Sequence, residues 1–175
     1  PASLALATII IYALLYTPMK PISNLNTLIG ALVGALPPMI GWSAANGKIN
    51  FPCVVLALIL FFWQLPHFLA LSWIYRDEYK KAGFQMLGAN KDDELSGRIC
   101  VMGVLFLIPL CLFLFTKGPL SLLYAILSVA LNIFYLIPAW RFFKNRNNMM
   151  ARNLFRSSLL YLPVLIFIIM LDLFI

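Results

Sequence analysis

Two neighbouring segments of this chain place polar or charged side chains in or beside a long apolar run. Residues 63–68 read Trp63-Gln64-Leu65-Pro66-His67-Phe68 and contain the only histidine. Residues 76–81, where the run ends, place two carboxylates beside three cations. Polar groups in hydrocarbon cost several kcal/mol each, so inside a membrane they indicate a functional site. We therefore expect the chemistry of the protein in these two segments.

The charged segment, residues 76–81, has the side chains that a phosphate and its metal require. Mg²⁺ prefers oxygen ligands and commonly joins one or two carboxylates to a substrate phosphate. Asp77 and Glu78 could supply these carboxylates. The remaining phosphate charge could be held by the cations Arg76, Lys80 and Lys81. The alternative is a solvated connection whose charges balance one another.

The polar residues of segment 63–68 predict a cavity below that charged mouth. Pro66 removes a backbone donor and tends to kink a helix, which would open carbonyls toward a cavity. A helix rises about 1.5 Å per residue, so His67 would lie roughly 15 Å from the level of Asp77. Aromatic side chains would line the apolar body between them. The alternative is a histidine bonded to a neighbouring helix.

The connections before the second and fourth apolar runs lie on the same side of the protein if consecutive runs cross the membrane in alternate directions. Lys20 and Asn26 could join the charged mouth, whereas Ser23 or Asn24 suits a helix cap. The acids of residues 92–94 precede a helix and fit the dipole of its first turn.

The second apolar run combines a small-residue face with a break. Gly30 and Gly34 allow close helix packing. Pro37 and Pro38 interrupt the helix at membrane depth, which is tolerated only where the freed backbone is buried or lines a cavity.

Composition identifies an integral membrane protein. The 175 residues are 63% hydrophobic and 11% charged, with a mean hydropathy of +0.94, whereas soluble domains have about 25% charged residues. The net charge of +7 comes from cations beside apolar runs and forms no basic stripe, which disfavours nucleic-acid binding. Cys53, Cys100 and Cys111 fit neither a disulfide framework nor a zinc site, so we expect them to pack.

The apolar runs predict a polytopic bundle of six transmembrane helices, an all-α fold in one domain of residues 1–175. If consecutive helices alternate direction, 11 of the 13 cations lie on one side, and only Lys48 and Lys117 lie on the other. The positive-inside rule places the basic side in the cytoplasm or matrix. The basic residues 141–156 suggest attraction to anionic lipid or, alternatively, a contact to a substrate carboxylate. The predicted spans are 2–16, 25–45, 52–75, 97–116, 119–142 and 154–175.

Several of these segments together resemble one enzyme family, the protohaem IX farnesyltransferases (haem O synthases) of the intramembrane aromatic prenyltransferase superfamily. The resemblance is ordered and correctly spaced from Tyr16 to about Leu87, and it favours mitochondrial over bacterial members. It rests on residues 16–20, 26–30, 34–42, 63–68, 76–79 and 82–87.

This resemblance implies about nine helices, of which the chain would supply the last six. The family's first acid-rich motif would precede Pro1, so we expect that an amino-terminal part is missing and that the fragment alone is inactive. The implied reaction transfers farnesyl from farnesyl diphosphate to a vinyl group of haem b, which gives haem O, with Mg²⁺ as cofactor. The implied roles are metal binding for Asp77 and Glu78, orientation of the loop for Tyr79, diphosphate binding for Lys20, Asn26, Arg76 and Lys81, and a haem or prenyl pocket formed by His67, Gln64, Trp63, Phe68 and Trp73.

The resemblance also implies a membrane and partners for the protein, and it leaves alternative functions open. The expected membrane is the mitochondrial inner membrane, or alternatively a bacterial plasma membrane. The expected partners are membrane lipid and haem A synthase or other oxidase-assembly proteins, with no nucleic acid. Rival hypotheses are a quinone-precursor prenyltransferase, a polytopic transporter and a non-catalytic assembly subunit.

Overall fold

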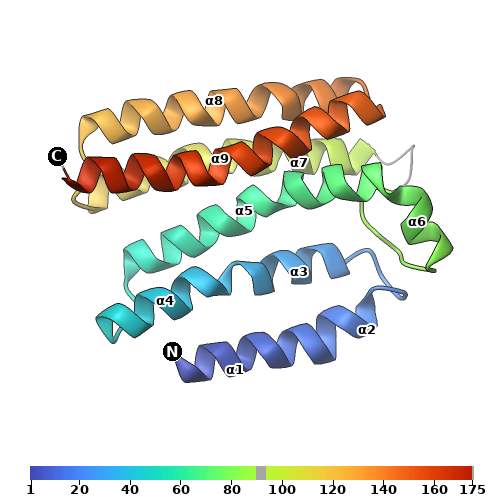
Figure 1. The fold of residues 1–175 in the computed structure, drawn as a ribbon, viewed down its shortest axis with the longest axis horizontal. Coiled ribbons are helices and arrows are strands. Elements are labelled where there is room, and N and C mark those ends of the chain that lie inside the picture. The colour runs from blue at the N-terminus through green and yellow to red at the C-terminus, as the bar shows by residue number, and fades with distance from the viewer. Residues whose placement is uncertain (90–93, 175) are drawn as a thin grey trace.

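The chain folds into a bundle of long helices. The computed structural model describes residues 1–89 and 94–174, and in these ranges it contains no strand. In Figure 1, α5 (Phe51–Ile74) lies between the first two spans and the layer formed by α7 (Glu94–Lys117), α8 (Leu122–Lys144) and α9 (Asn148–Phe174). Among the described residues, six helical stretches are long and apolar enough to cross a membrane, which confirms the all-α fold class and the predicted number of spans.

The first two spans are irregular near their prolines. Residues 2–19 form α1 (Ala2–Ile11), the π-helical turn η1 (Tyr12–Tyr16) and α2 (Thr17–Met19). The second span is split at Ala35 into α3 (Asn26–Gly34) and α4 (Leu36–Asn46). Because Pro37 and Pro38 lack an N–H, the carbonyls of Val33 and Gly34, four residues earlier, lose the donors that a continuous helix would give them. The predicted break is therefore present, just before the two prolines.

Helix α5 is the central element, and it begins and continues for clear local reasons. The Asn50 side chain caps its first turn by accepting a hydrogen bond from the Cys53 N–H at 3.3 Å. The helix continues through Pro66. The Phe62 carbonyl, four residues earlier, faces Gly103 of α7, where an added Cβ would lie 3.2 Å from its oxygen. The prediction that this carbonyl opens toward a cavity was therefore wrong, because glycine lets α7 close over it.

The charged segment forms a short helix, α6 (Arg76–Lys81), where a loop was expected. Tyr75, with φ −104° and ψ 24°, separates it from α5. The chain then turns back at Gly83 and Gly88, whose φ values of 73° and 88° are ones that only glycine adopts easily. The segment 84–89 therefore returns alongside the bundle end.

The layer α7–α9 buries most of the core against α5. Its interior includes Tyr135 and Tyr161, which are fully buried. Helix α9 begins at Asn148, six residues before the predicted start at 154. The arginines near its start therefore lie on the helix and not in a loop. Glu94 opens α7 and pairs with Arg98 at 2.9 Å. The other two acids of residues 92–94 lie outside the described residues.

Candidate functional site

A cavity of about 430 Å³ lies at the end of the bundle that carries α6. Figure 1 places this end beside the end of α2 and the start of α9. The lining combines one residue after α2 with residues of α6 and of the segment that follows it. The lining residues are Asn24, Arg76, Asp77, Lys80, Phe84, Gln85, Met86 and Ala89.

The helical form of α6 decides which charged residues reach this cavity. Side chains three and four apart share a helix face, whereas adjacent ones point about 100° apart. Arg76, Asp77 and Lys80 accordingly line the cavity. Glu78 and Lys81, three residues apart on another face, do not line it. The pairing of Asp77 with Glu78 assumed a loop, and the helix separates them.

Arg76 is held in place while keeping donors for a ligand. Its Nη1 donates to the Trp73 carbonyl at 2.7 Å and to Asn148 Oδ1 at 2.8 Å. Its guanidinium also lies 5.1 Å from the centroid of the Trp73 ring. A guanidinium has five N–H donors in a fixed plane, so these contacts orient Arg76 and leave other donors available.

Asn26 holds the cavity wall together. The side chain is fully buried, and Nδ2 donates to the carbonyls of Ser23 and Gln85, both at 2.6 Å. The Gln85 N–H in turn donates to the Lys20 carbonyl at 2.8 Å. Both hydrogens of the Asn26 amide are thus engaged, which gives it a positioning role in place of direct diphosphate contact.

The Lys20 ammonium lies above two aromatic rings at the rim of the cavity. It is 4.7 Å from the centroid of the Tyr16 ring and 5.9 Å from that of Phe84. Such cation–π contacts are worth about 0.5–1 kcal/mol at exposed sites. They place the charge of Lys20 next to Phe84, one of the lining residues.

A smaller hollow of about 90 Å³ lies on the bundle side of the first one. The two share Met86, and the smaller one is walled by aromatic and aliphatic side chains together with the hydroxyl residues Thr27 and Ser72. Burial raises the pKa of Tyr79, and the neighbouring Tyr75 raises it further, so the phenol stays neutral at physiological pH. The lining residues are Tyr16, Thr27, Gly30, Phe68, Leu71, Ser72, Tyr79 and Met86.

His67, midway along α5, is fixed against α9. Its Nδ1 lies 2.8 Å from Ser158 Oγ, and its ring stacks between Trp63 and Phe155 with centroids 5.4 and 4.9 Å away. The Ser158 hydroxyl donates to the Phe155 carbonyl at 2.6 Å. Ser158 Oγ must therefore accept from His67, which assigns the hydrogen to Nδ1 and leaves the lone pair on Nε2.

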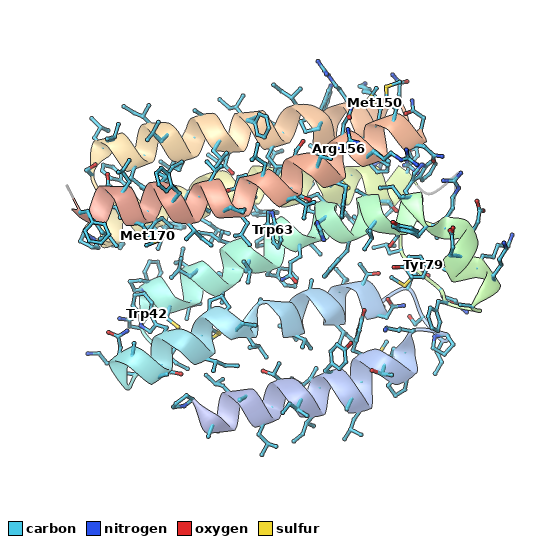
Figure 2. All side chains as sticks on the ribbon, in the orientation of Figure 1. Trp42, Trp63, Tyr79, Met150, Arg156 and Met170 are labelled. Carbon is cyan, nitrogen blue, oxygen red and sulfur yellow. The ribbon has the colours of Figure 1, made fainter. Side chains whose placement is uncertain are left out.

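Three other residues of the predicted haem or prenyl pocket mainly join helices. Trp63 Nε1 donates to the Ser158 carbonyl at 2.8 Å. Gln64 Nε2 donates to the Ala31 carbonyl at 3.0 Å across the α3–α5 contact. Trp73 is 4% exposed and meets Phe142 edge-on, with centroids 5.8 Å apart. Figure 2 shows Trp63 midway along α5, far from Tyr79 at the α6 end.

Comparison with known proteins agrees with this architecture. The model of the UbiA prenyltransferase family matches residues 1–167. The chain belongs to the UbiA prenyltransferase family. No solved structure matches it.

The most similar curated relatives that we compared share one name, protoheme IX farnesyltransferase. A mitochondrial one from Arabidopsis thaliana is 36% identical over 164 residues, which cover 93% of this chain and 38% of that protein. One from Koribacter versatilis is 37% identical over 179 residues, 98% of this chain and 58% of that protein. A mitochondrial one from Gibberella zeae is 38% identical over 180 residues, 93% of this chain and 35% of that protein. The chain thus spans between a third and three fifths of the length of these relatives.

The donor set of this UbiA-family chain fits part of a magnesium site. Among residues 1–89 and 94–174, no three histidine, cysteine or acidic side chains gather as a metal cluster. Asp77 is the one carboxylate on the described lining of the larger cavity. Mg²⁺ is usually held by one or two carboxylates together with substrate phosphates and waters, so Asp77 suits a Mg²⁺ that is shared with a diphosphate.

Sequence reasoning missed the residues that return from α6. Phe84, Gln85 and Met86 line the larger cavity because the chain reverses at Gly83. The signal was present in Ala82-Gly83, a helix end followed by glycine. Asn24, predicted only as a cap, also lines the cavity.

Proposed function

We propose that the complete protein transfers the farnesyl group of farnesyl diphosphate to a vinyl group of haem b and so makes haem O for haem A synthesis. The supporting observation is a cavity with Arg76, Asp77 and Lys80 at the end of the third candidate span of a UbiA-family chain. The names of the relatives point to haem as the acceptor.

In this proposal the larger cavity holds the diphosphate. Arg76 and Lys80 donate to its oxygens, and their charge opposes the negative charge that grows as the allylic carbon–oxygen bond breaks. Asp77 would hold Mg²⁺, which when bound neutralises the leaving group further. The Asn26 contact to Gln85 keeps the wall of the cavity closed around this charge.

The smaller hollow would receive the first part of the isoprenoid. Its walls include Phe68, Tyr79 and Met86, and Met86 also lines the larger cavity. Such walls exclude water, so the electrophilic allylic carbon is protected until it meets the vinyl group. Water then adds to the resulting carbocation and gives the hydroxyethylfarnesyl side chain.

His67 would hold the haem through Nε2. Its Nδ1–H is directed at Ser158, and the stacking of Trp63 and Phe155 fixes the plane of the ring. The Nε2 lone pair can bind the haem iron or accept a hydrogen bond from the haem environment. Its position on α5, nine residues or about 2.5 turns before α6, separates the haem from the diphosphate.

The proposed setting is the mitochondrial inner membrane, with the bacterial plasma membrane as the alternative, and the proposed partners include haem A synthase. The six spans support a multi-pass membrane protein. Relatives with mitochondrial names and relatives without them both match the chain.

The test is complementation with the complete protein in cells that lack haem O synthase activity. Pigments are extracted from the membranes and separated by chromatography. We expect haem O to appear with the wild-type protein and to fall by about 10²-fold or more with Asp77→Asn. A prenylated quinone precursor in place of haem O would overturn the choice of acceptor, and neither product at normal protein levels would overturn the proposal as a whole.

A further inference from the structure

A groove on the outer side of α8 and α9 lies apart from the candidate active site. It has a volume of about 390 Å³, and Arg141 and Arg156 line it near the turn between α8 and α9. Asn153 and Ser157 of α9 also line it, and Phe134 and Leu160 line it farther from the turn between α8 and α9 than the two arginines do. Other faces of the same helices are buried in the core, as Tyr135 and Tyr161 show. The groove therefore faces the surroundings of the bundle.

The cations of the groove have no partner in the part of the chain that the structure describes. The ion pair among the described residues joins Arg98 to Glu94, both on α7 and outside the groove. No hydrogen bond of the described residues involves the side chains of Arg141 or Arg156. No acidic residue lines the groove. Two unpaired guanidinium groups in one hollow form a site for an anion, most naturally a phosphate.

The depth of the lining residues matches a lipid lying along the bundle. Arg141 is three residues, roughly 4 Å, from the end of α8, and Arg156 is eight residues, roughly 12 Å, from the start of α9. Phe134 and Leu160 lie deeper, roughly 15 and 18 Å from those helix ends. Both are exposed, at 44% and 53%. The groove thus offers charge at the membrane boundary and an apolar track below it.

A second hollow of similar size extends the charged part. It measures about 390 Å³, shares Asn153 and Arg156 with the groove and adds Arg152. The basic end of the bundle is also the side that the positive-inside rule assigns to the cytoplasm or matrix, where anionic lipids attract juxtamembrane cations. Charge complementarity therefore favours a lipid of that leaflet over an apolar protein segment.

We propose that the α8–α9 groove, defined by Arg141, Asn153, Arg156, Ser157, Phe134 and Leu160, is a binding site for one anionic phospholipid. The guanidinium groups hold the headgroup phosphate, and an acyl chain follows Phe134 and Leu160. This site is separate from the farnesyl-transfer site and does not depend on it.

The experiment uses the complete protein, reconstituted in phosphatidylcholine bilayers containing phosphatidylglycerol, then extracted and weighed intact by mass spectrometry. We expect the wild type to retain phosphatidylglycerol and the variant Arg141→Gln/Arg156→Gln to bind it on the order of thirtyfold more weakly. The matched control is Arg98→Gln/Lys144→Gln, which removes two cations from the same side but outside the groove. It should retain the lipid as the wild type does, and equal losses in both variants would show only diffuse surface charge and overturn the site.

Further experiments distinguish a bound lipid from the other possible occupants of the groove, free phosphate and a segment of the protein. Ser157→Phe fills the groove while keeping both arginines, and we expect it to lose the lipid as well; full retention would contradict the groove. Excess inorganic phosphate should leave the bound lipid in place, whereas its displacement would identify a free-phosphate site. Finally, the variant Ser157→Cys in lipid-free detergent should react with a water-soluble thiol reagent. The natural cysteines are buried, so the reaction reports on position 157. A protected Cys at this position would show that a segment of the protein covers the groove.

Discussion

The basic end of the bundle and the middle of α5 use their polar side chains in opposite ways. At the basic end, Asp77 and Lys80 line a cavity, and within residues 1–89 and 94–174 neither has an ion-pair partner. In the middle of α5, Gln64 and Trp63 donate to carbonyls of α3 and α9, and His67 bonds to Ser158. Buried polar groups without partners are costly, and these three side chains avoid that cost by bonding to groups of neighbouring helices. The difference suggests that the free groups near water are the reactive ones.

His67 stands between these two cases. Its Nδ1 is used by the fold, and its Nε2 keeps a lone pair. A residue of this kind can serve the structure and a ligand together. The comparison therefore predicts graded effects of substitution along α5 and α6, and each of the following changes tests one step of that gradient.

The largest effect is expected for Asp77→Asn in the complete protein. Because Asp77 lines the cavity and would hold the metal, its neutralisation should lower the rate of haem O formation by about 10²–10³. Glu78→Gln is the matched control, since Glu78 is exposed and lies outside the cavity, and it should change the rate by less than about threefold. The rates are measured in membranes that contain equal amounts of protein. Equal losses in both variants would mean that α6 has another orientation in the working enzyme.

Gly34→Ala tests whether the middle of α5 is structural. A Cβ at Gly34 would collide with Gln64 Oε1, whereas nothing lies within 4 Å of a Cβ added at Gly41. We expect Gly34→Ala to lower the free energy of unfolding by about 1–3 kcal/mol and Gly41→Ala, inside α4 and free of contacts, to keep it the same or raise it by up to about 1 kcal/mol. Thermal unfolding in detergent measures both.

A second substitution locates the cause of that loss. If the collision is responsible, Gly34→Ala/Gln64→Ala should be more stable than Gly34→Ala alone, although it lacks the bond to the Ala31 carbonyl. Equal melting of Gly34→Ala and Gly41→Ala would contradict the close contact of α3 and α5.

The sequence predicted the six spans because hydrophobic length is a local property that a bilayer makes decisive. It also predicted the break beside Pro37, since the lost N–H is a property of the residue itself. The charges of residues 76–81 were correctly placed at the exit of the third span. These features depend on composition and backbone chemistry alone.

Contacts between distant segments could not be predicted in the same way. Gln64 in an apolar run suggested a pocket, but the Ala31 carbonyl that it bonds lies 33 residues away. The carbonyl freed by Pro66 meets Gly103, which no local pattern indicates. Six charged or polar residues in a row suggested a loop, whereas α6 is helical and so separates Asp77 from Glu78. Which face a side chain takes depends on tertiary packing that the sequence leaves open.

His67→Ala should affect haem more than diphosphate. We expect the KM for haem to rise about tenfold, the value of one hydrogen bond of about 1.4 kcal/mol, with little change in the KM for farnesyl diphosphate. Ser158→Ala removes only the acceptor of the Nδ1–H and should have a smaller effect, because Trp63 and Phe155 still hold the ring. Steady-state kinetics with each substrate varied separate the two constants. Equal changes in both constants would place His67 with Gln64 as a purely structural residue.

Tyr79→Phe should have the smallest effect on haem O formation. It tests whether Tyr79 only forms a wall of the smaller hollow or takes part in the reaction. Burial raises the pKa of the Tyr79 phenol above its usual value of about 10, and Tyr75 adds to the shift. A raised pKa means that the fold favours the neutral phenol, so its contribution to stability is complete below pH 10 and is lost as the pH rises beyond that value. Between pH 6 and 9 the hydroxyl cannot act as an anion, and the pH profile of haem O formation should be the same for Tyr79→Phe and the wild type. A profile that loses a limb in the variant would show that Tyr79 exchanges a proton during the reaction, which would move it from the walls of the smaller hollow to the reacting groups.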